Sequence, residues 1–166
     1  MAVNRCEWAQ VDDPLMVKYH DEEYGVRRTG FVAYFEKLCL ESFQAGLSWR
    51  CILHKREAFR QSFLGFDPYK VSLMDEKDIE KLMGNKAIVR NRRKIEAVIK
   101  NAKLAIKIEE DGGFESYINA YDNGQMLAKD LKKRGFSFVG ETICQAYLTS
   151  IGVLKAHEKG CFKYTD

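Results

Sequence analysis

Residues 132–140 of the chain are Lys-Lys-Arg-Gly-Phe-Ser-Phe-Val-Gly. Within this stretch, residues 135–140 form a short turn that begins with Gly135 and ends with Gly140. The turn follows a basic helix and precedes an apolar helix that the spacing predicts over 142–151. Two short helices joined by a glycine-bounded hairpin can direct backbone N–H groups at a phosphate, as helix N-termini do. An ordinary tight turn, whose glycines relieve steric strain, is the alternative. The functional interpretation predicts a helix-hairpin-helix over about 126–151 that holds a duplex without recognising its sequence.

The rest of the chain is also typical of helices. It has only two prolines in 166 residues and few runs of alternating β-branched side chains, so long stretches are free to be helical. The length corresponds to about one ordinary domain, and no segment has the composition of a linker or a repeat. We therefore expect an all-α fold with a single domain over residues 1–166.

Local signals place several of the helices. The apolar residues of 31–43 recur at helical spacing, which predicts a core helix. Ser48 is a suitable N-cap for the next helix, and Asp75 with Asp78 three residues later resembles a capping box. Apolar residues over 88–108 also recur at helical spacing, with the basic residues mostly off that stripe. This pattern predicts a long helix with one packed face and one basic face.

The charge of the chain is unevenly distributed. The formal net charge is only +3, which is too small to indicate a polyanionic partner. Basic residues nevertheless gather in 86–107 and 129–134, whereas 1–25 and 109–122 are acidic. Two basic segments predict a positively charged surface on one part of the molecule.

The five cysteines are an odd number without regular spacing, which argues against a disulfide framework and for a reducing compartment. The longest apolar stretches are a few residues, far short of the roughly 20 needed to cross a bilayer. Residues 1–17 lack a basic start followed by an apolar core, so they do not resemble a secretion signal. We expect a cytoplasmic protein that has no contact with a membrane.

Four thiol and imidazole side chains form a candidate metal site: Cys6, His20, His157 and Cys161. His157 and Cys161 have the i, i+4 spacing that puts two ligands on one helical face. Thiolate and imidazole are the ligands that Zn²⁺ prefers, and a closed shell of four would be structural. The alternative is two buried thiols and two surface histidines, because the gap between Cys6 and His20 is not that of a standard zinc finger.

Glu41 lies within the predicted core helix next to apolar residues. An unpaired carboxylate there is costly, so it has either a partner or a task. An internal salt bridge is one explanation, and a cationic ligand that supplies the matching charge is the other. The aromatic residues near this motif are core filler or a stacking pocket; they are Trp8, Tyr19, Tyr24 and Trp49.

Five collinear motifs resemble those of bacterial 3-methyladenine DNA glycosylase I, a family of the helix-hairpin-helix DNA glycosylase superfamily. They are Trp-Ala-Gln-Val-Asp-Asp-Pro-Leu at 8–15, Tyr-His-Asp-Glu-Glu-Tyr-Gly at 19–25, Leu-Glu-Ser-Phe-Gln-Ala-Gly-Leu-Ser-Trp at 40–49, Ile-Val-Arg-Asn-Arg-Arg-Lys-Ile at 88–95, and the hairpin at 132–140. The resemblance covers nearly the whole chain. It departs at residue 24, where the relatives carry Trp and this chain has Tyr, and in the segment 121–129, which is shorter here.

The resemblance implies an all-α helix-hairpin-helix glycosylase fold whose two chain ends are joined by one structural zinc ion on Cys6, His20, His157 and Cys161. It implies a base pocket with Glu41 as the catalytic residue. The residues expected around the base are Trp8, Tyr19, Tyr24, Gln44 and Trp49, and those expected to bind DNA are Lys133, Arg134, Gly135, Phe138 and Gly140. The partners would be alkylated double-stranded DNA and the product base 3-methyladenine, and we expect a monomer.

A 3-methyladenine nucleotide in DNA carries a cationic base on a weakened glycosidic bond, so selecting the base is harder than expelling it. Aromatic faces can stack on a flipped cation, and a carboxylate can accept from its exocyclic amine. On this interpretation Glu41 discriminates and orients the base, with Gln44 beside it. The chain has no Asp between Leu131 and Thr165, and no Lys or Arg over 135–154. These absences exclude an aspartate after the hairpin and a Schiff-base lysine there, which favours a monofunctional glycosylase.

Three alternatives remain open from the sequence. A zinc-stabilised helix-hairpin-helix protein with weak or no glycosylase activity would keep the hairpin and the basic helix. A helical protein-interaction domain would show no salt-dependent DNA binding. A redox thiol protein is the third, although Cys39, Cys51 and Cys144 form no CxxC motif.

Overall fold

The computed structural model of the chain describes residues 2–166, and it has no strand among them. The all-α prediction is therefore confirmed. The elements in chain order are the short 3-10 helix η1 (Glu7–Ala9), α1 (Pro14–Glu22), α2 (Phe31–Phe43), α3 (Trp49–Ser62), the 3-10 helix η2 (Leu64–Phe66), α4 (Pro68–Val71), α5 (Glu76–Met83), α6 (Arg92–Glu110), α7 (Phe114–Asn119), α8 (Gly124–Lys133) and α9 (Glu141–Ser150).

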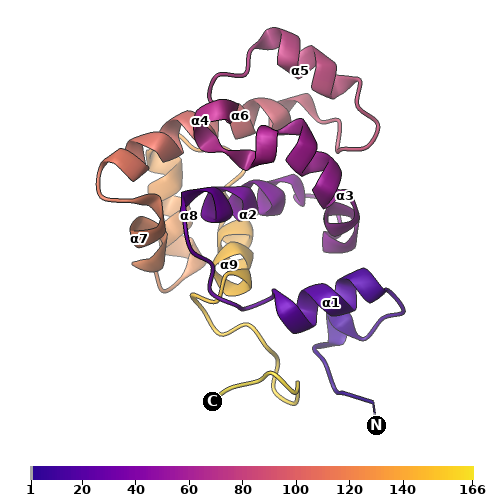
Figure 1. Cartoon of the computed structure of the whole chain (residues 1–166). Coiled ribbons are helices and arrows are strands. Elements are labelled where there is room, and N and C mark those ends of the chain that lie inside the picture. Colours follow the sequence, from indigo (N-terminus) through magenta and orange to yellow (C-terminus); the bar gives the residue numbers. More distant parts are fainter. Residues whose placement is uncertain (1) are drawn as a thin grey trace.

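Helix α2 is the centre of the fold. Residues 34–43 are all buried, and α2 packs against α3, α6, α7 and α9 (Figure 1). A helix with apolar residues around most of its circumference belongs in a core rather than on a surface. The core helix predicted over 31–43 is confirmed with these bounds, and its C-terminal end carries the residues of the site described below.

The local capping signals also function as expected. The Ser48 side chain accepts from the backbone N of Cys51 at 3.1 Å and begins α3. Asp75 and Asp78 form both hydrogen bonds of a capping box at the start of α5. Caps of this kind supply partners for backbone N–H groups that the first helical turn leaves unpaired.

The long helix predicted over 88–108 begins later than expected. Asn91 is the N-cap of α6, because its side chain accepts from the backbone N of Lys94, and the helix starts at Arg92. An Asn side chain competes with helical hydrogen bonding and favours a helix start over a helix interior. The hairpin helices differ slightly as well, since α8 starts at Gly124 behind its Asn123 cap, two residues before the expected boundary.

The two ends of the chain meet at one end of the molecule, beside α1 (Figure 1). The backbone N of Phe162 donates to the Asn4 carbonyl at 2.8 Å, and the backbone N of Glu7 donates to Glu158 Oε2 at 2.8 Å. Segments more than 150 residues apart in sequence are thus held together. Among residues 2–166, no helix combines the length and the apolar character needed to cross a bilayer.

Candidate functional site

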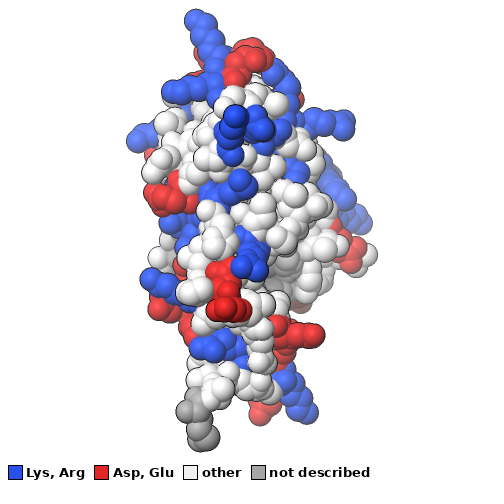
Figure 2. All heavy atoms as spheres, turned by 90° about the vertical axis from the view of Figure 1, so that its right-hand side faces the viewer, with Lys and Arg blue, Asp and Glu red and all other residues white. Residues whose placement is uncertain are grey.

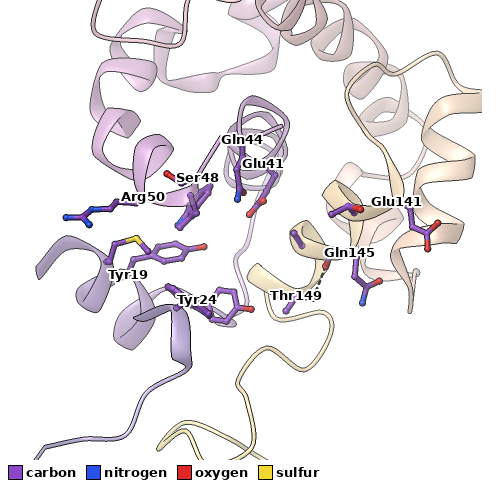
Figure 3. A pocket seen from close by; sticks show the side chains of 14 residues that line it. Tyr19, Tyr24, Glu41, Gln44, Ser48, Arg50, Glu141, Gln145 and Thr149 are labelled. Atoms are coloured by element: carbon purple, nitrogen blue, oxygen red, sulfur yellow. Dashed lines mark hydrogen bonds between the residues drawn. The ribbon is translucent and has the colours of Figure 1, made fainter. Parts of the chain in front are cut away.

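A pocket of about 840 Å³ opens between α1, the C-terminal end of α2 and helix α9. All six residues that the sequence predicted for a base pocket line it: Trp8, Tyr19, Tyr24, Glu41, Gln44 and Trp49. In Figure 3 the Glu41 carboxylate points from α2 into the space between Tyr19 and Tyr24 on one side and Thr149 on the other. The structure therefore brings together residues from three separate motifs.

The aromatic wall is a packed cluster. The rings of Trp8 and Tyr24 meet edge to face with centroids 4.9 Å apart, and those of Tyr19 and Trp49 lie 5.2 Å apart. Tyr19 is buried, while the other three rings are half-buried. Mutual packing fixes the orientation of each ring. The pocket consequently offers preformed aromatic surface to a flat ligand.

Glu41 is paired within the protein. Its Oε1 lies 3.1 Å from Nζ of Lys37, one helical turn earlier on α2, and both side chains are buried. The Lys37 ammonium also donates to the Tyr19 hydroxyl at 2.6 Å and lies 3.5 Å from the centre of the Trp49 ring. The internal salt bridge is thus confirmed, and the matching charge that a ligand was expected to supply is already present.

Lys37 was missed by the sequence analysis, although its i, i+4 spacing to Glu41 is a signal for an ion pair. Burial lowers the pKa of the Lys37 ammonium to about 8, while the Glu41 carboxylate opposes that decrease. The buried Tyr19 hydroxyl has its pKa raised well above the usual value by burial, so it remains a neutral phenol.

The opposite wall of the pocket was not predicted. It comes from one face of α9, with Glu141, Gln145 and Thr149 spaced four residues apart and Thr142 and Ala146 beside them. These residues are exposed or half-buried, whereas the other face of α9 is in the core. Residues four positions apart share one face of a helix. This polar face, directly after the hairpin, is the sequence signal that could have identified them. Met16, Ser48 and Arg50 complete the lining.

The four predicted metal ligands lie together. Their ligand atoms are all within 4.8 Å of one another. Cys161 Sγ lies 3.5 Å from His20 Nε2, and Cys6 Sγ lies 3.6 Å from His157 Nδ1. A tetrahedral zinc ion with its usual bond lengths separates sulfur and nitrogen ligands by about 3.6 Å. The donor set and its spacing therefore fit this metal.

The surroundings of the cluster also suit a metal site. His20 Nδ1 lies 2.8 Å from Asp21 Oδ1, and His157 Nε2 lies 3.0 Å from the Tyr24 carbonyl oxygen. Such partners orient imidazole ligands and fix the nitrogen that faces the ion. Backbone N–H groups approach both sulfur atoms, from Glu158 to Cys6 and from Lys163 to Cys161.

The hairpin between α8 and α9 is anchored on α6. The buried Asn101 side chain accepts from the Ser137 backbone N at 3.0 Å and donates to the Ser137 carbonyl at 2.9 Å. Gly135 has φ +101°, which favours glycine, and Phe138 has φ +57°. Gly140 has an ordinary φ of −65°, and a Cβ there would meet nothing within 4 Å. The fold therefore requires a glycine at 135 and leaves open space at 140.

The basic segments are less uniform than the sequence suggested. Lys94 is buried, and its Nζ donates to the carbonyls of Phe43 and Ala45 at the end of α2. Arg92 is paired with Glu76, Glu80 and Glu96. The basic face predicted for this helix therefore does not include Lys94, and acidic neighbours neutralise its Arg92. Figure 2 shows Lys and Arg side chains distributed along one face of the molecule, with a largely uncharged area among them.

At the hairpin itself, Lys132 and Lys133 are exposed. Arg134 is held by Asp130 at 2.8 Å and lies over the Tyr117 ring. On α6, Lys100 donates to Ser137 Oγ at 2.8 Å. The positive charges at the hairpin are thus Lys132 and Lys133, the positioned Arg134, and Lys100 of α6.

An all-helical fold that sets a glycine-bounded hairpin beside an aromatic pocket with a buried carboxylate is the arrangement expected of a DNA glycosylase, a class of enzyme that binds a flipped base. The family model described as methyladenine glycosylase matches residues 8–127 and 119–164. DNA-3-methyladenine glycosylase 1 of Escherichia coli is 40% identical over 183 aligned positions, which span 98% of this chain and 97% of that protein. The chain therefore belongs to the methyladenine glycosylase family.

Solved structures of relatives agree with this fold. A crystal structure of 3-methyladenine DNA glycosylase I superimposes with a TM-score of 0.93 at 39% identity, over 98% of this chain and 100% of that one. A variant of 3-methyladenine DNA glycosylase I in complex with 3-methyladenine gives a TM-score of 0.90 at 34% identity, over 99% of each chain. The resemblance found from the five motifs is thereby confirmed.

Proposed function

We propose that this protein is a monofunctional DNA-3-methyladenine glycosylase that excises the cationic base from alkylated double-stranded DNA, the first step of base excision repair. The observation that carries the proposal is the buried carboxylate of Glu41 at the base of an aromatic pocket, in a chain of the methyladenine glycosylase family. An enzyme acting on a base within a duplex must first flip it into such a pocket.

In the proposed complex the base stacks against Tyr19 and Trp49, with Trp8 and Tyr24 closing the aromatic side. Glu41 accepts from the exocyclic amine of the base. Lys37 occupies Oε1 of that carboxylate, so the ligand would use Oε2. Gln44, one helical turn after Glu41, would hold the edge of the base from the C-cap of α2.

The chemical step needs little help from acid catalysis. As the bond between C1′ of the sugar and N9 of the base breaks, the bonding electron pair stays with the base, which leaves as a neutral molecule. Water then adds to C1′ and releases a proton to solvent. Residues 135–154 contain no Lys or Arg, so this segment supplies no amine for a Schiff base, which supports a monofunctional enzyme.

The hairpin is proposed to hold the DNA backbone. Gly135 and Gly140 would let the main chain approach a phosphate closely, and Phe138 lies between them in the turn. Lys133 and Arg134 would add positive charge at the end of α8. The open space at Gly140 supports this role, because nothing in the protein itself explains a glycine there.

The cluster of Cys6, His20, His157 and Cys161 would hold one zinc ion per chain. When bound, zinc would complete a closed four-ligand shell and act as a structural cross-link. His20 comes from α1 and Cys161 from the C-terminal segment, so this pair joins the two ends of the fold. The packing of His20 against Trp8 connects that cross-link to the pocket wall.

We further propose that the enzyme works as a monomer in the cytoplasm. None of the five cysteines, all of which lie within residues 2–166, forms a disulfide, which suits a reducing compartment.

The deciding experiment is an assay for free 3-methyladenine released from methylated duplex DNA. Release that rises with enzyme concentration is expected, with unmethylated duplex as the control. If the protein binds duplex DNA but releases no base, it is the zinc-stabilised DNA-binding protein without glycosylase activity instead.

A further inference from the structure

Lys37 connects the carboxylate and the aromatic wall from behind the pocket. It is 1% exposed and does not line the cavity, whereas Glu41, Tyr19 and Trp49 all do. Its ammonium contacts each of these three residues. One buried charge therefore acts on the carboxylate and on both rings that are proposed to stack on the base.

This ammonium changes the charge that a ligand encounters. Lys37 and Glu41 together carry no net charge, so a cation in the pocket gains less from the carboxylate than it would if the carboxylate were alone. The face of Trp49 that Lys37 covers already holds a cation, which reduces the attraction of that ring for a second cation. The neutralised carboxylate and the occupied face of Trp49 thus weaken the binding of a cation, whereas a neutral base keeps its hydrogen bonds and its stacking.

Other charged and titratable groups surround the ammonium but are paired among themselves. Arg56 on α3 binds Glu23 through two hydrogen bonds of 2.6 and 2.9 Å, and Arg28 binds the same carboxylate at 3.3 Å. The groups that influence Lys37 are Tyr19, Glu23, Arg28, Glu41 and Arg56. Burial raises the pKa of the Tyr19 hydroxyl well above its usual value, and, against the opposing effect of burial, the hydrogen bonds to Glu23 raise the pKa of Arg56.

We propose that Lys37 is a specificity-determining positioning residue, which neutralises Glu41 so that the pocket favours the neutral departing base over the cationic base still joined to its sugar. The inference rests on the proposed function. During cleavage the electron pair of the C1′–N9 bond moves onto the base, so the positive charge of the base decreases. The Lys37 ammonium repels the cationic base of the bound substrate and repels it less as that charge decreases. It therefore favours the transition state over the bound substrate.

The test compares two small ligands at pH 7. One is free 3-methyladenine, which is neutral, and the other is 3,9-dimethyladeninium, in which a methyl group replaces the sugar and keeps the ring cationic. The affinities of wild type and Lys37→Met for both ligands are measured by titration calorimetry or fluorescence. Met is unbranched and of similar length, so it keeps most of the packing.

In Lys37→Met the affinity for the cation relative to that for the neutral base is expected to rise roughly tenfold or more, because the carboxylate charge is no longer offset. The double variant Lys37→Met with Glu41→Gln again has no net charge, so its ratio should return close to that of wild type. Lys77→Met removes a lysine from the exposed side of α5 and should leave the ratio within about twofold.

A ratio that is unchanged in Lys37→Met, or still raised in the double variant, would overturn the inference. If Lys37→Met does not fold, the same two titrations are made on the wild-type protein at several pH values. The affinity for the cation relative to the neutral base should rise between pH 7 and 9.5, because Lys37 loses its proton near pH 8. A ratio that does not change with pH would reject the role of Lys37. A wild-type protein that binds neither ligand and releases no base would reject the proposed function. That result differs from failure of the inference alone, in which both ligands bind but their affinity ratio does not change.

Discussion

Lys37 Nζ and Glu41 Oε1 lie 3.1 Å apart on successive turns of α2, and both side chains are buried beneath the aromatic pocket. A buried ion pair is not by itself a gain in stability, since both charges lose their hydration. The ion pair matters most when one partner is removed, because the remaining charge is then buried without a counter-charge. The pair therefore links the folding of the core to the proposed binding of the base at Glu41.

Glu41→Gln should both destabilise the protein and weaken base binding. Unfolding should become easier by about 1–3 kcal/mol, below the usual cost of breaking a buried pair because Lys37 can shed its proton. Free 3-methyladenine should bind more weakly by about 1–3 kcal/mol, the scale of a charged hydrogen bond. Denaturant unfolding and ligand titration measure the two effects. Equal affinities and equal excision rates would show that Glu41 is only an ion-pair partner.

The pH dependence of stability should reveal Lys37. Its pKa is lowered from the ordinary value of 10.5 to about 8 in the folded protein, so between these values the unfolded chain binds more protons than the folded one. Stability should therefore rise with pH over this range relative to Lys37→Met. Urea unfolding of both proteins from pH 7 to 10 measures the difference. Parallel curves would mean that the lysine titrates normally.

One zinc ion per chain is expected by elemental analysis of protein purified without chelator. Cys161→Ala should lose the metal and unfold more easily, because a closed shell contributes its binding free energy to the fold. Asp21→Asn should reduce zinc affinity roughly 10- to 100-fold, since Asp21 orients the His20 ligand. Less than half an equivalent of zinc in wild type, or unchanged stability in Cys161→Ala, would reject the site.

Gly140→Asp should weaken non-specific duplex binding at least about tenfold and change its salt dependence, because it places a negative charge where a phosphate is expected. The variant should fold normally, since the backbone conformation is ordinary and the added Cβ meets nothing. Leu73→Asp adds the same charge at a position that is 83% exposed and outside residues 135–140, and serves as the control. Equal losses in the two variants would remove the hairpin from the DNA interface.

Gly124→Ala should destabilise the hairpin helices by about 1–3 kcal/mol, the usual cost of overpacking. A Cβ at this position would lie 2.4 Å from the backbone N of Gln145, where α8 and α9 cross. Thermal unfolding measures the effect, and Gly140→Ala, where φ is ordinary and an added Cβ meets nothing within 4 Å, offers a comparison for the loss of a glycine. A stable Gly124→Ala protein would mean that the two helices can separate without cost.

Much of the fold could be predicted because its signals are local. The core helix of 31–43, the Ser48 cap and the capping box of Asp75 and Asp78 each depend on residues within a few positions of one another. The late start of α6 was missed because the Asn91 cap and the apolar spacing over 88–108 give conflicting signals, and the cap determines where the first hydrogen bond forms.

The sequence by itself determined the types of residue at the site. It identified the four thiol and imidazole side chains that the fold brings together, the aromatic residues with Glu41, and the glycine-bounded hairpin, since these residue types are rare and ordered along the chain. Only the tertiary structure decided which charged side chains are buried or paired and which face the pocket. Lys94 and Arg92 belong to the fold rather than a basic face, α9 forms a pocket wall, and Lys37 neutralises Glu41. The reason is physical: helical periodicity and capping act over a few residues, whereas burial and charge pairing depend on which distant segments meet.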